Sequence, residues 1–447
     1  MSRAMGWTGS LRPLTVRSRR MAASRTARRS LRDLLRMRRF VSAIKNVPHP
    51  EEPAQPASRR TRDGTAGFLS RCFVAAMVFG LAACAVPGRE DYAALVAEHA
   101  ASAPAAPHLA DDKMVMADGT ALPLRVWLPK GEVTAMVLAV HGFNDYSNAF
   151  EGPARALAAH GIATYAYDQR GFGAAPLHGR WPGRWQLADD LAAASRLVRA
   201  RHPDRKLYVM GESMGAAVAI VAMTGETATP RPDADGLILV APAVWGRQTM
   251  GALERGALAV SVRLLPGLTV SGRGIIKITP SDNNEMLRGL SRDPLVIKST
   301  RIDTIYGLVD LMDAAFASSN RLDMPLLYLY GQRDEIVPKK PTELMIAHLP
   351  PATAGSRRIA WYANGYHMLM RDLDSAVVMG DIAGWIAEQK GPLPSGADRY
   401  AETVLGLDAV ARVDDQPFAD KPFAKTAADA LGSPARGERS SAAPGHP

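Results

Sequence analysis

The chain has 447 residues, of which 47% are hydrophobic, so it can form one large domain or two ordinary ones. Its formal net charge of +10 is unevenly distributed: residues 1–83 contain 17 Lys+Arg and 4 Asp+Glu, a net of +13, and the remainder contains 37 and 40, a net of −3. Because the basic residues cluster near the N-terminus, the composition argues against a nucleic-acid-binding surface on the main folded part.

The N-terminal part of the chain divides into two segments. Residues 1–66 are rich in Arg, Ser and Pro and lack a sustained apolar face, which predicts disorder, unless translation starts further along the chain. Residues 67–83 contain a basic flank and an apolar run of about 13 residues, too short to cross a bilayer. This pattern is typical of a secretory signal peptide. An uncleaved hydrophobic anchor or a buried helix would also fit it.

The end of the apolar run, Leu81-Ala82-Ala83-Cys84, resembles the lipobox of bacterial lipoproteins. The resemblance implies cleavage before Cys84, lipidation of its thiol, and anchoring to a membrane of the bacterial cell envelope. Ala85 stands where the inner-membrane retention signal has Asp, which favours the outer membrane or the periplasmic face. The only other cysteine is Cys72 in the signal segment, so the mature chain would form no disulfide and would depend on its core.

From residue 113 onwards, short apolar runs alternate with segments of helical length. Residues 84–112 are rich in Ala, Pro and Asp and are predicted to be a tether. Strands are predicted at 122–128, 135–140, 162–167, 207–210, 237–240, 326–330 and 359–362, and helices at 150–160, 186–201, 253–264 and 302–317. Near-continuous apolar strands separated by helices predict an α/β fold, with a mostly parallel sheet that helices cover on both faces.

One long interval interrupts this alternation. Residues 243–322 contain helical patterns but no clear strand, which predicts a helical cap inserted between two strands of the 113–395 domain. The cap carries Trp245, Met250, Leu264 and Leu265, which would suit an apolar pocket. Residues 396–447 are rich in Ala, Pro, Asp and Ser and are predicted to be mostly disordered, with at most one loose helix.

The most informative motif is Gly211-Glu212-Ser213-Met214-Gly215. It follows an apolar strand and precedes an Ala-rich helix, the context of a nucleophile elbow, in which a serine stands on a sharp turn. Glycines two positions before and after Ser213 would relieve the crowding of such a turn. A serine hydroxyl needs a neighbouring base and an acid that orients this base. In an elbow fold, the acid and then the histidine follow the serine in the chain.

Three histidines follow Ser213, and only one of them is well placed to act as the base. His446 lies in the tail, and His348 lies within a helical pattern, whereas His367 follows the strand at 359–362 in a glycine-containing loop. The acid is predicted to be Asp334, directly after the strand at 326–330, with Glu335 as its competitor. The acid would hold the imidazole in the required tautomer.

The oxyanion formed during the reaction needs backbone N–H donors. One donor is predicted at Met214, directly after the nucleophile, and the other at Phe143, in the loop after the strand at 135–140. Gly142 would let this loop bend toward the substrate. His141 precedes the nucleophile and is predicted to fix the loop.

In its motifs and their order, the chain resembles the α/β-hydrolases of the monoacylglycerol lipase, lysophospholipase and serine aminopeptidase branch. The matching segments cover roughly residues 113–390 and are His141-Gly142, Asp168-Gln169-Arg170-Gly171-Phe172-Gly173, Asp190-Leu191, the elbow, Arg292-Asp293-Pro294-Leu295, Gly331 to Pro338, and Gly365-Tyr366-His367. The loop Phe143-Asn144-Asp145-Tyr146 departs from the Gly-Glu-His-like run of the lipases, which leaves monoacylglycerol specificity open.

The expected activity is two-step hydrolysis of acyl esters through an acyl-enzyme on Ser213, without a metal or an organic cofactor. The expected substrates are lipid-like esters such as lysophospholipids or monoacylglycerols. A serine aminopeptidase-like enzyme would need carboxylates in the cap, and Glu254, Asp282 and Glu285 have no diagnostic spacing. The motifs also leave open an acyltransferase that uses the same residues and a non-catalytic binding protein.

Overall fold

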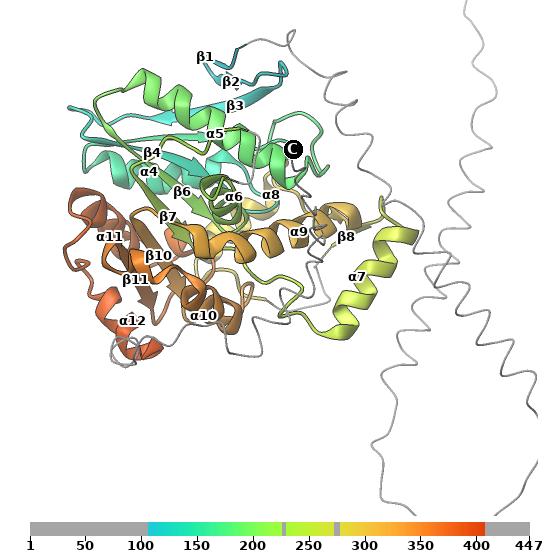
Figure 1. Cartoon of the computed structure of the whole chain (residues 1–447). Coiled ribbons are helices and arrows are strands. Elements are labelled where there is room, and N and C mark those ends of the chain that lie inside the picture. Colours follow the sequence, from blue (N-terminus) through green and yellow to red (C-terminus); the bar gives the residue numbers. More distant parts are fainter. Residues whose placement is uncertain (1–105, 226–228, 272–277, 407–447) are drawn as a thin grey trace, which may run out of the picture. The chain divides into compact units, whose positions relative to one another are not determined.

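The computed structural model describes residues 106–225, 229–271 and 278–406. The predicted signal peptide, Cys84 and the residues after 406 lie outside the described residues. Nine strands of the described part form one sheet, in the order β1-β2-β3-β5-β4-β6-β7-β10-β11 (Figure 1). Their bounds are β1 His108–Ala110, β2 Lys113–Val115, β3 Ala121–Trp127, β4 Ala135–Val140, β5 Ile162–Tyr167, β6 Lys206–Glu212, β7 Gly236–Val240, β10 Leu326–Gly331 and β11 Arg357–Tyr362.

The sheet is mostly parallel, as the sequence predicts. The strands from β5 to β11 in the sheet order pair in parallel, and the β1–β2, β2–β3 and β3–β5 pairs are antiparallel. In β4, Met136 and Leu138 face one buried cluster, and Val137 and Ala139 face the other. Since successive side chains point to opposite faces, a strand covered on both sides must be apolar throughout.

Helices cover both faces of the sheet. On one face lie α5 Arg184–Arg201, α6 Met214–Met223, α9 Ile302–Ser318 and α10 Lys339–His348, and on the other lie α4 Glu151–Ala158 and α11 Ser375–Ala387. The described part also contains short 3-10 helices: η1 Ser147–Phe150, η2 Ser319–Arg321, η3 Pro351–Ser356 and η4 Leu369–Arg371. The loops after β4, β6, β10 and β11 leave the carboxyl edge of the sheet, where ligands bind in open α/β sheets.

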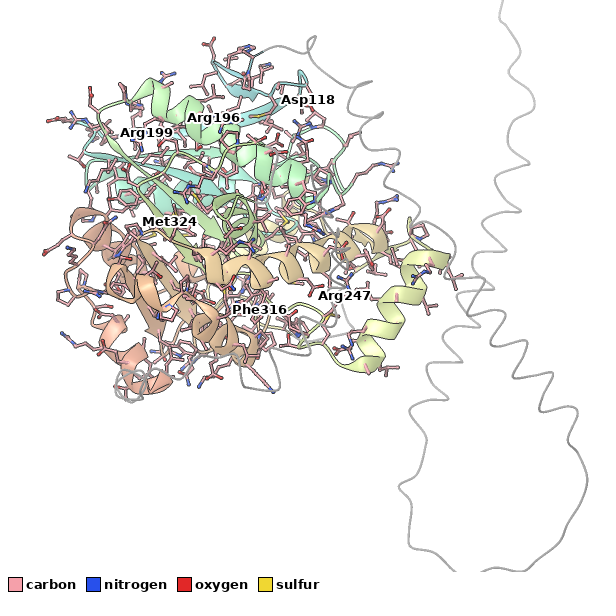
Figure 2. All side chains as sticks on the ribbon, in the orientation of Figure 1. Asp118, Arg196, Arg199, Arg247, Phe316 and Met324 are labelled. Carbon is pink, nitrogen blue, oxygen red and sulfur yellow. The ribbon has the colours of Figure 1, made fainter. Side chains whose placement is uncertain are left out.

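The cap lies between β7 and β10, as predicted, and consists of α7 Ala252–Leu264, β8 Thr269–Val270, α8 Asn284–Arg292, β9 Thr300–Arg301 and α9. The sequence shows no clear strand in this interval, and the structure has two short strands there, β8 and β9. β8 and β9 pair in antiparallel orientation, and two residues are too few to produce an alternating pattern. Arg247, labelled in Figure 2, contacts Asp310 at 2.6 Å and Asp313 at 2.5 Å on α9, and so fixes the segment that enters the cap.

The folded part reaches beyond residues 113–395 at both ends. β1 begins at His108, within the stretch predicted to be a tether, and its three residues are too few to give a pattern. After residue 395 the chain forms α12 Ala397–Leu405, which places Ala401 in the core. No helix among the described residues is long and apolar enough to cross a membrane.

Candidate active site

Ser213 stands on the turn between β6 and α6, with a φ of 53° and a ψ of −113°. Residues with a side chain rarely adopt this backbone conformation, and it persists only where the surroundings impose it. Here the Ser213 N–H donates to the Val240 carbonyl at 2.9 Å, and the Ser213 carbonyl accepts from Ala243 N–H at 3.0 Å and Ala216 N–H at 3.1 Å. This is the strand–serine–helix geometry of a nucleophile elbow.

The two glycines of the motif allow close approach of neighbouring backbone. A Cβ atom on Gly215 would collide with the Val140 carbonyl of β4, and one on Gly211 would collide with the backbone of Ala216 at the start of α6. The elbow therefore needs glycine at both positions because any side chain would separate the strand from the helix.

The structure brings the three predicted catalytic side chains into one hydrogen-bonded chain. His367 Nε2 lies 2.9 Å from Ser213 Oγ, and His367 Nδ1 lies 2.7 Å from Asp334 Oδ2. The other carboxylate oxygen, Asp334 Oδ1, accepts from the N–H groups of Ile336 at 2.8 Å and Val337 at 2.9 Å. A carboxylate held in this way keeps the imidazole proton on Nδ1 and leaves Nε2 free to accept the serine proton.

The competing acid and histidine lie elsewhere. Glu335 is exposed, and its carboxylate accepts from the Thr279 N–H at 2.7 Å. His348 is stacked on Phe316, with ring centroids 5.1 Å apart, at the end of α10. His446 lies outside the described residues.

The two predicted oxyanion donors flank the nucleophile. Met214 is the first residue of α6, whose positive dipole end favours a developing negative charge. Phe143 follows Gly142, and a Cβ on Gly142 would lie 3.4 Å from Ser213 Cβ, so this loop runs against the elbow. Over the described stretches of chain, the N–H groups of Phe143 and Met214 have no hydrogen-bond acceptor, which leaves both available to a ligand.

His141 is hydrogen-bonded to backbone atoms of two loops and not to Ser213. Its Nε2 accepts from the Gln169 N–H at 2.9 Å, so the ring proton is on Nδ1, which lies 2.9 Å from the Gly142 carbonyl oxygen. Burial lowers the pKa of His141, against the opposing effect of the Gly142 carbonyl and nearby carboxylates. The ring is therefore neutral and ties the loop of residues 141–146, called the oxyanion loop after its predicted role, to the loop that follows β5.

The Asp168 to Gly173 motif holds buried charges in place. Asp168 accepts from the N–H of Ser147 at 3.0 Å and from its hydroxyl at 2.5 Å. Arg170 is fully buried between Asp118 and Asp190, with its closest contact to each at 2.6 Å. Such a buried cation is tolerated because paired carboxylates replace its water.

The oxyanion loop is also attached to the cap. The Tyr146 hydroxyl donates to Asp293 at 2.7 Å, in the Arg292 to Leu295 motif, and Asn144 Nδ2 donates to Thr300 Oγ1 at 2.8 Å. Burial and the Asp293 carboxylate raise the pKa of Tyr146, so its hydroxyl remains a donor at physiological pH. These contacts give the cap motif a structural role.

A cavity of about 390 Å³ opens onto Ser213 and His367. Its walls are mainly apolar, and they include Trp245, Met250, Leu308, Val309, Met312 and Ile336. Two of the four cap residues considered for such a pocket, Trp245 and Met250, line it. The other two, Leu264 and Leu265, are 57% and 42% exposed instead, at the C-terminal end of α7.

Sequence reasoning missed the polar residues of this cavity. Arg371 contacts Asp145 at 2.7 Å and Glu212 at 2.9 Å, and all three residues line the cavity wall. Glu212 lies inside the elbow motif and Arg371 lies four residues after His367, so their positions in the sequence already indicate that both are close to the catalytic residues. Their pairing joins residues 159 positions apart, and no local pattern reports it.

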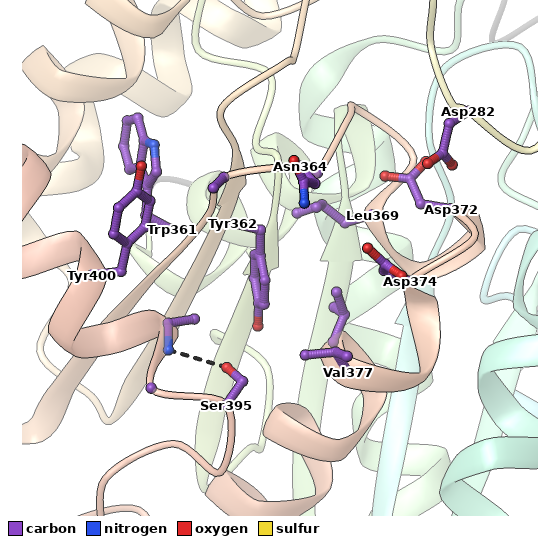
Figure 3. Close-up of a pocket in the computed structure, with 15 residues that line it drawn as sticks. Asp282, Trp361, Tyr362, Asn364, Leu369, Asp372, Asp374, Val377, Ser395 and Tyr400 are labelled. Carbon is purple, nitrogen blue, oxygen red and sulfur yellow. Dashed lines mark hydrogen bonds between the residues drawn. The ribbon is translucent and has the colours of Figure 1, made fainter.

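A second cavity, of about 250 Å³, lies beside β11 and α12 (Figure 3). Three of its lining residues are the carboxylates Asp282, Asp372 and Asp374. Asp372 accepts from Ser281 Oγ at 2.6 Å and from the Tyr366 N–H at 2.8 Å, and Asp282 accepts from the Leu373 N–H at 2.9 Å. These groups anchor residues 363–374, the histidine loop that follows β11 and carries His367, to the cap.

With this geometry established, the comparisons define the class of protein. Residues 131–374 match the family described as serine aminopeptidase, S33, and the chain belongs to this family. The described fold is an α/β-hydrolase fold, which confirms the expected fold class.

The chain is similar to several proteins named as lipases. It is 25% identical to mouse (Mus musculus) monoglyceride lipase over 63% of this chain and 90% of that protein. It is 22% identical to Mycolicibacterium smegmatis monoacylglycerol lipase over 60% of this chain and 93% of that protein. Among solved structures, a soluble variant of Saccharomyces cerevisiae monoglyceride lipase has a TM-score of 0.50 at 19% identity, covering 65% of this chain and 97% of that one. A lipase in its open form has a TM-score of 0.52 at 17% identity, covering 63% of this chain and 99% of that one. These structural likenesses bear on the fold alone.

Proposed function

We propose that this protein hydrolyses single-chain acyl esters of the monoacylglycerol or lysophospholipid class through an acyl-enzyme on Ser213. The observation that carries the proposal is the Ser213–His367–Asp334 hydrogen-bonded chain at the mouth of a mainly apolar cavity. The broader assignment, a carboxylic ester hydrolase, agrees with relatives named monoglyceride lipase.

In the proposed reaction, His367 Nε2 takes the proton of Ser213 as Oγ attacks the acyl carbonyl. The N–H groups of Phe143 and Met214 stabilise the oxyanion. The oxyanion collapses, the C–O bond to the alcohol breaks, and His367 returns the proton to the leaving oxygen. Water then repeats the sequence on the acyl-enzyme and releases the fatty acid.

The charges beside the nucleophile favour a neutral head group. Asp145 and Glu212 carry two negative charges at the cavity wall, and Arg371 carries one positive charge, a net of −1. A lysophospholipid phosphate would meet repulsion there, whereas the glycerol of a monoacylglycerol would not. We therefore expect monoacylglycerols to be the better substrates.

A peptidase activity has less support. Glu254, Asp282 and Glu285 do not line the cavity at Ser213. The Glu254 carboxylate accepts from the Gly251 N–H of its own helix at 3.0 Å. The carboxylates that do line the cavity, Asp145 and Glu212, each bind Arg371, and the one Glu212 oxygen without a partner among the described residues, Oε1, is buried. An acyltransferase would share the same three side chains and differ only in the acceptor.

The test combines a fluorophosphonate probe with a panel of butyryl esters, monoacylglycerols, lysophospholipids and aminoacyl amides. We expect labelling of the wild type, no labelling of Ser213→Ala, and the highest kcat/KM on monoacylglycerols. Labelling of Ser213→Ala would overturn the assignment of the nucleophile. A preference for aminoacyl amides would favour the peptidase, and transfer of the acyl group to an added alcohol in place of water would favour the acyltransferase.

We also propose that the mature chain begins at lipidated Cys84, after the signal segment 67–83, and is tethered to the bacterial envelope, with the outer membrane or the periplasmic face preferred. One observation within the described part supports a lipid surface as a neighbour. On α7, Leu253, Val260 and Leu264 lie at helical spacing and are 83%, 51% and 57% exposed. Cys84→Ser should abolish fatty-acid incorporation and membrane fractionation, and unchanged incorporation of fatty acid would contradict lipidation.

A further inference from the structure

A single buried guanidinium contacts two of the loops that surround the nucleophile. Arg371 Nη1 donates to Asp145 Oδ2 at 2.7 Å, and Nη2 donates to Glu212 Oε2 at 2.9 Å. The side chains of Arg371, Asp145 and Glu212 are 9%, 8% and 2% exposed. Burial opposes the charge of Arg371, but the two carboxylates outweigh this effect and raise its pKa, so it remains a cation.

Each member of this cluster belongs to a different catalytic segment. Asp145 is two residues after Phe143 in the oxyanion loop, and its Oδ1 also accepts from the Tyr146 N–H at 2.9 Å. Glu212 directly precedes Ser213 in the elbow. Arg371 lies in η4, four residues after His367. The guanidinium therefore lies where the oxyanion loop, the nucleophile turn and the histidine loop meet.

We propose that Arg371 is a positioning residue that sets the distances among Phe143 N–H, Ser213 and His367 by holding Asp145 and Glu212 in one planar clamp. A guanidinium suits this role because its fixed fork can bond two carboxylates at once, whereas a lysine ammonium acts as a point charge. The proposal concerns the proposed hydrolytic site and rests on Ser213 being its nucleophile.

The other interpretation of the cluster is charge compensation alone. Two buried carboxylates need a cation, and loss of the cation destabilises the fold whether or not catalysis depends on it. The two interpretations separate in a variant that removes all three charges, Asp145→Asn/Glu212→Gln/Arg371→Met. This variant has no buried charge to compensate, but it also has no clamp.

The experiment measures kcat and KM on a soluble butyryl ester, the rate constant of fluorophosphonate labelling, and the melting temperature. The variants are Arg371→Lys, Arg371→Met and the triple variant, with Arg196→Met on the exposed face of α5 as the matched control. Rates are normalised to the fraction of protein that the probe finally labels. A short ester makes few cap contacts, so it reports on the catalytic atoms themselves.

We expect Arg371→Lys to lower kcat by about 10²-fold, the effect of a misplacement of about 1 Å, with KM within about twofold of the wild type. The triple variant should recover the melting temperature that Arg371→Met loses, but not kcat. Recovery of kcat along with stability in the triple variant, or wild-type kcat in Arg371→Lys, would overturn the clamp. If Arg371→Met does not fold, the other two variants decide.

The two proposals fail in different ways. If the wild type is labelled by the probe but does not hydrolyse esters, the proposed substrate class is wrong. The clamp is then still tested by the labelling rate constants, because phosphonylation needs the same nucleophile, base and oxyanion donors.

Discussion

Replacing Asp334 by Asn should invert the proton arrangement of His367. In the wild type, Oδ1 accepts from the N–H groups of Ile336 and Val337, and Oδ2 faces His367 Nδ1 at 2.7 Å. An asparagine that keeps both backbone bonds must turn its NH₂ group toward Nδ1. The imidazole then carries its proton on Nε2, which can no longer accept the proton of Ser213.

The structure also sets the free energy needed to restore the active tautomer of His367. Turning the amide the other way would give up two backbone hydrogen bonds of about 0.5–1.5 kcal/mol each, or about 1–3 kcal/mol in total. The inactive tautomer therefore dominates, and the neutral amide also no longer stabilises the imidazolium, so we expect kcat to fall by about 10³–10⁴-fold from the two effects together. This loss corresponds to about 4–5.5 kcal/mol of activation free energy.

The assay is steady-state hydrolysis of a butyryl ester, with active sites counted by fluorophosphonate labelling. The matched control is Glu335→Gln, which neutralises the adjacent exposed carboxylate and should retain kcat within about twofold. An Asp334→Asn variant that keeps more than about a tenth of the activity would refute the tautomer argument. Equal losses in the two variants would refute the choice between the two acids.

Three further predictions concern the elbow, the histidine loop and the cavity. Gly215→Ala forces a Cβ into the Val140 carbonyl and should lower the free energy of unfolding by about 1–3 kcal/mol, measured by chemical denaturation. The control is Gly256→Ala, in open space on α7, which should be neutral or stabilise the fold by up to about 1 kcal/mol. Equal effects of the two substitutions would contradict the packing argument. Burial raises the pKa of Asp372 to about 6, above its unfolded value of about 3.9, so stability falls as pH rises through this window. Asp372→Asn should flatten this part of the profile of melting temperature against pH, and an unchanged slope would contradict the assignment. Met312→Trp should fill the cavity and lower kcat/KM for dodecanoyl esters by about 10-fold or more relative to butyryl esters, and an equal effect on both would place the acyl chain elsewhere.

The local features of the site could be predicted because each depends on neighbours in sequence. The elbow needs small residues at fixed offsets from Ser213. The strand before Asp334 is buried throughout, and the strand before His367 is marked by the buried apolar run 359–361. The order serine, acid, histidine then restricted the candidates to two acids and one well-placed base. The position directly after the strand favoured Asp334 over Glu335. The contact that distinguishes the two carboxylates, Asp334 Oδ2 to His367 Nδ1, depends on the fold of the loop and is seen only in the structure.

The sequence alone determined the fold class, the position of the cap and the three candidate side chains, because hydrophobic periodicity and turn chemistry are local. Tertiary structure decided which cap residues reach the cavity, the anchoring of the oxyanion loop by Asp293 and Thr300, and the pairing of Arg371 with Asp145 and Glu212. These contacts join residues 147 to 226 positions apart. They depend on how the loops at the carboxyl edge of the sheet meet the cap, and that arrangement is set by packing rather than by any periodic pattern.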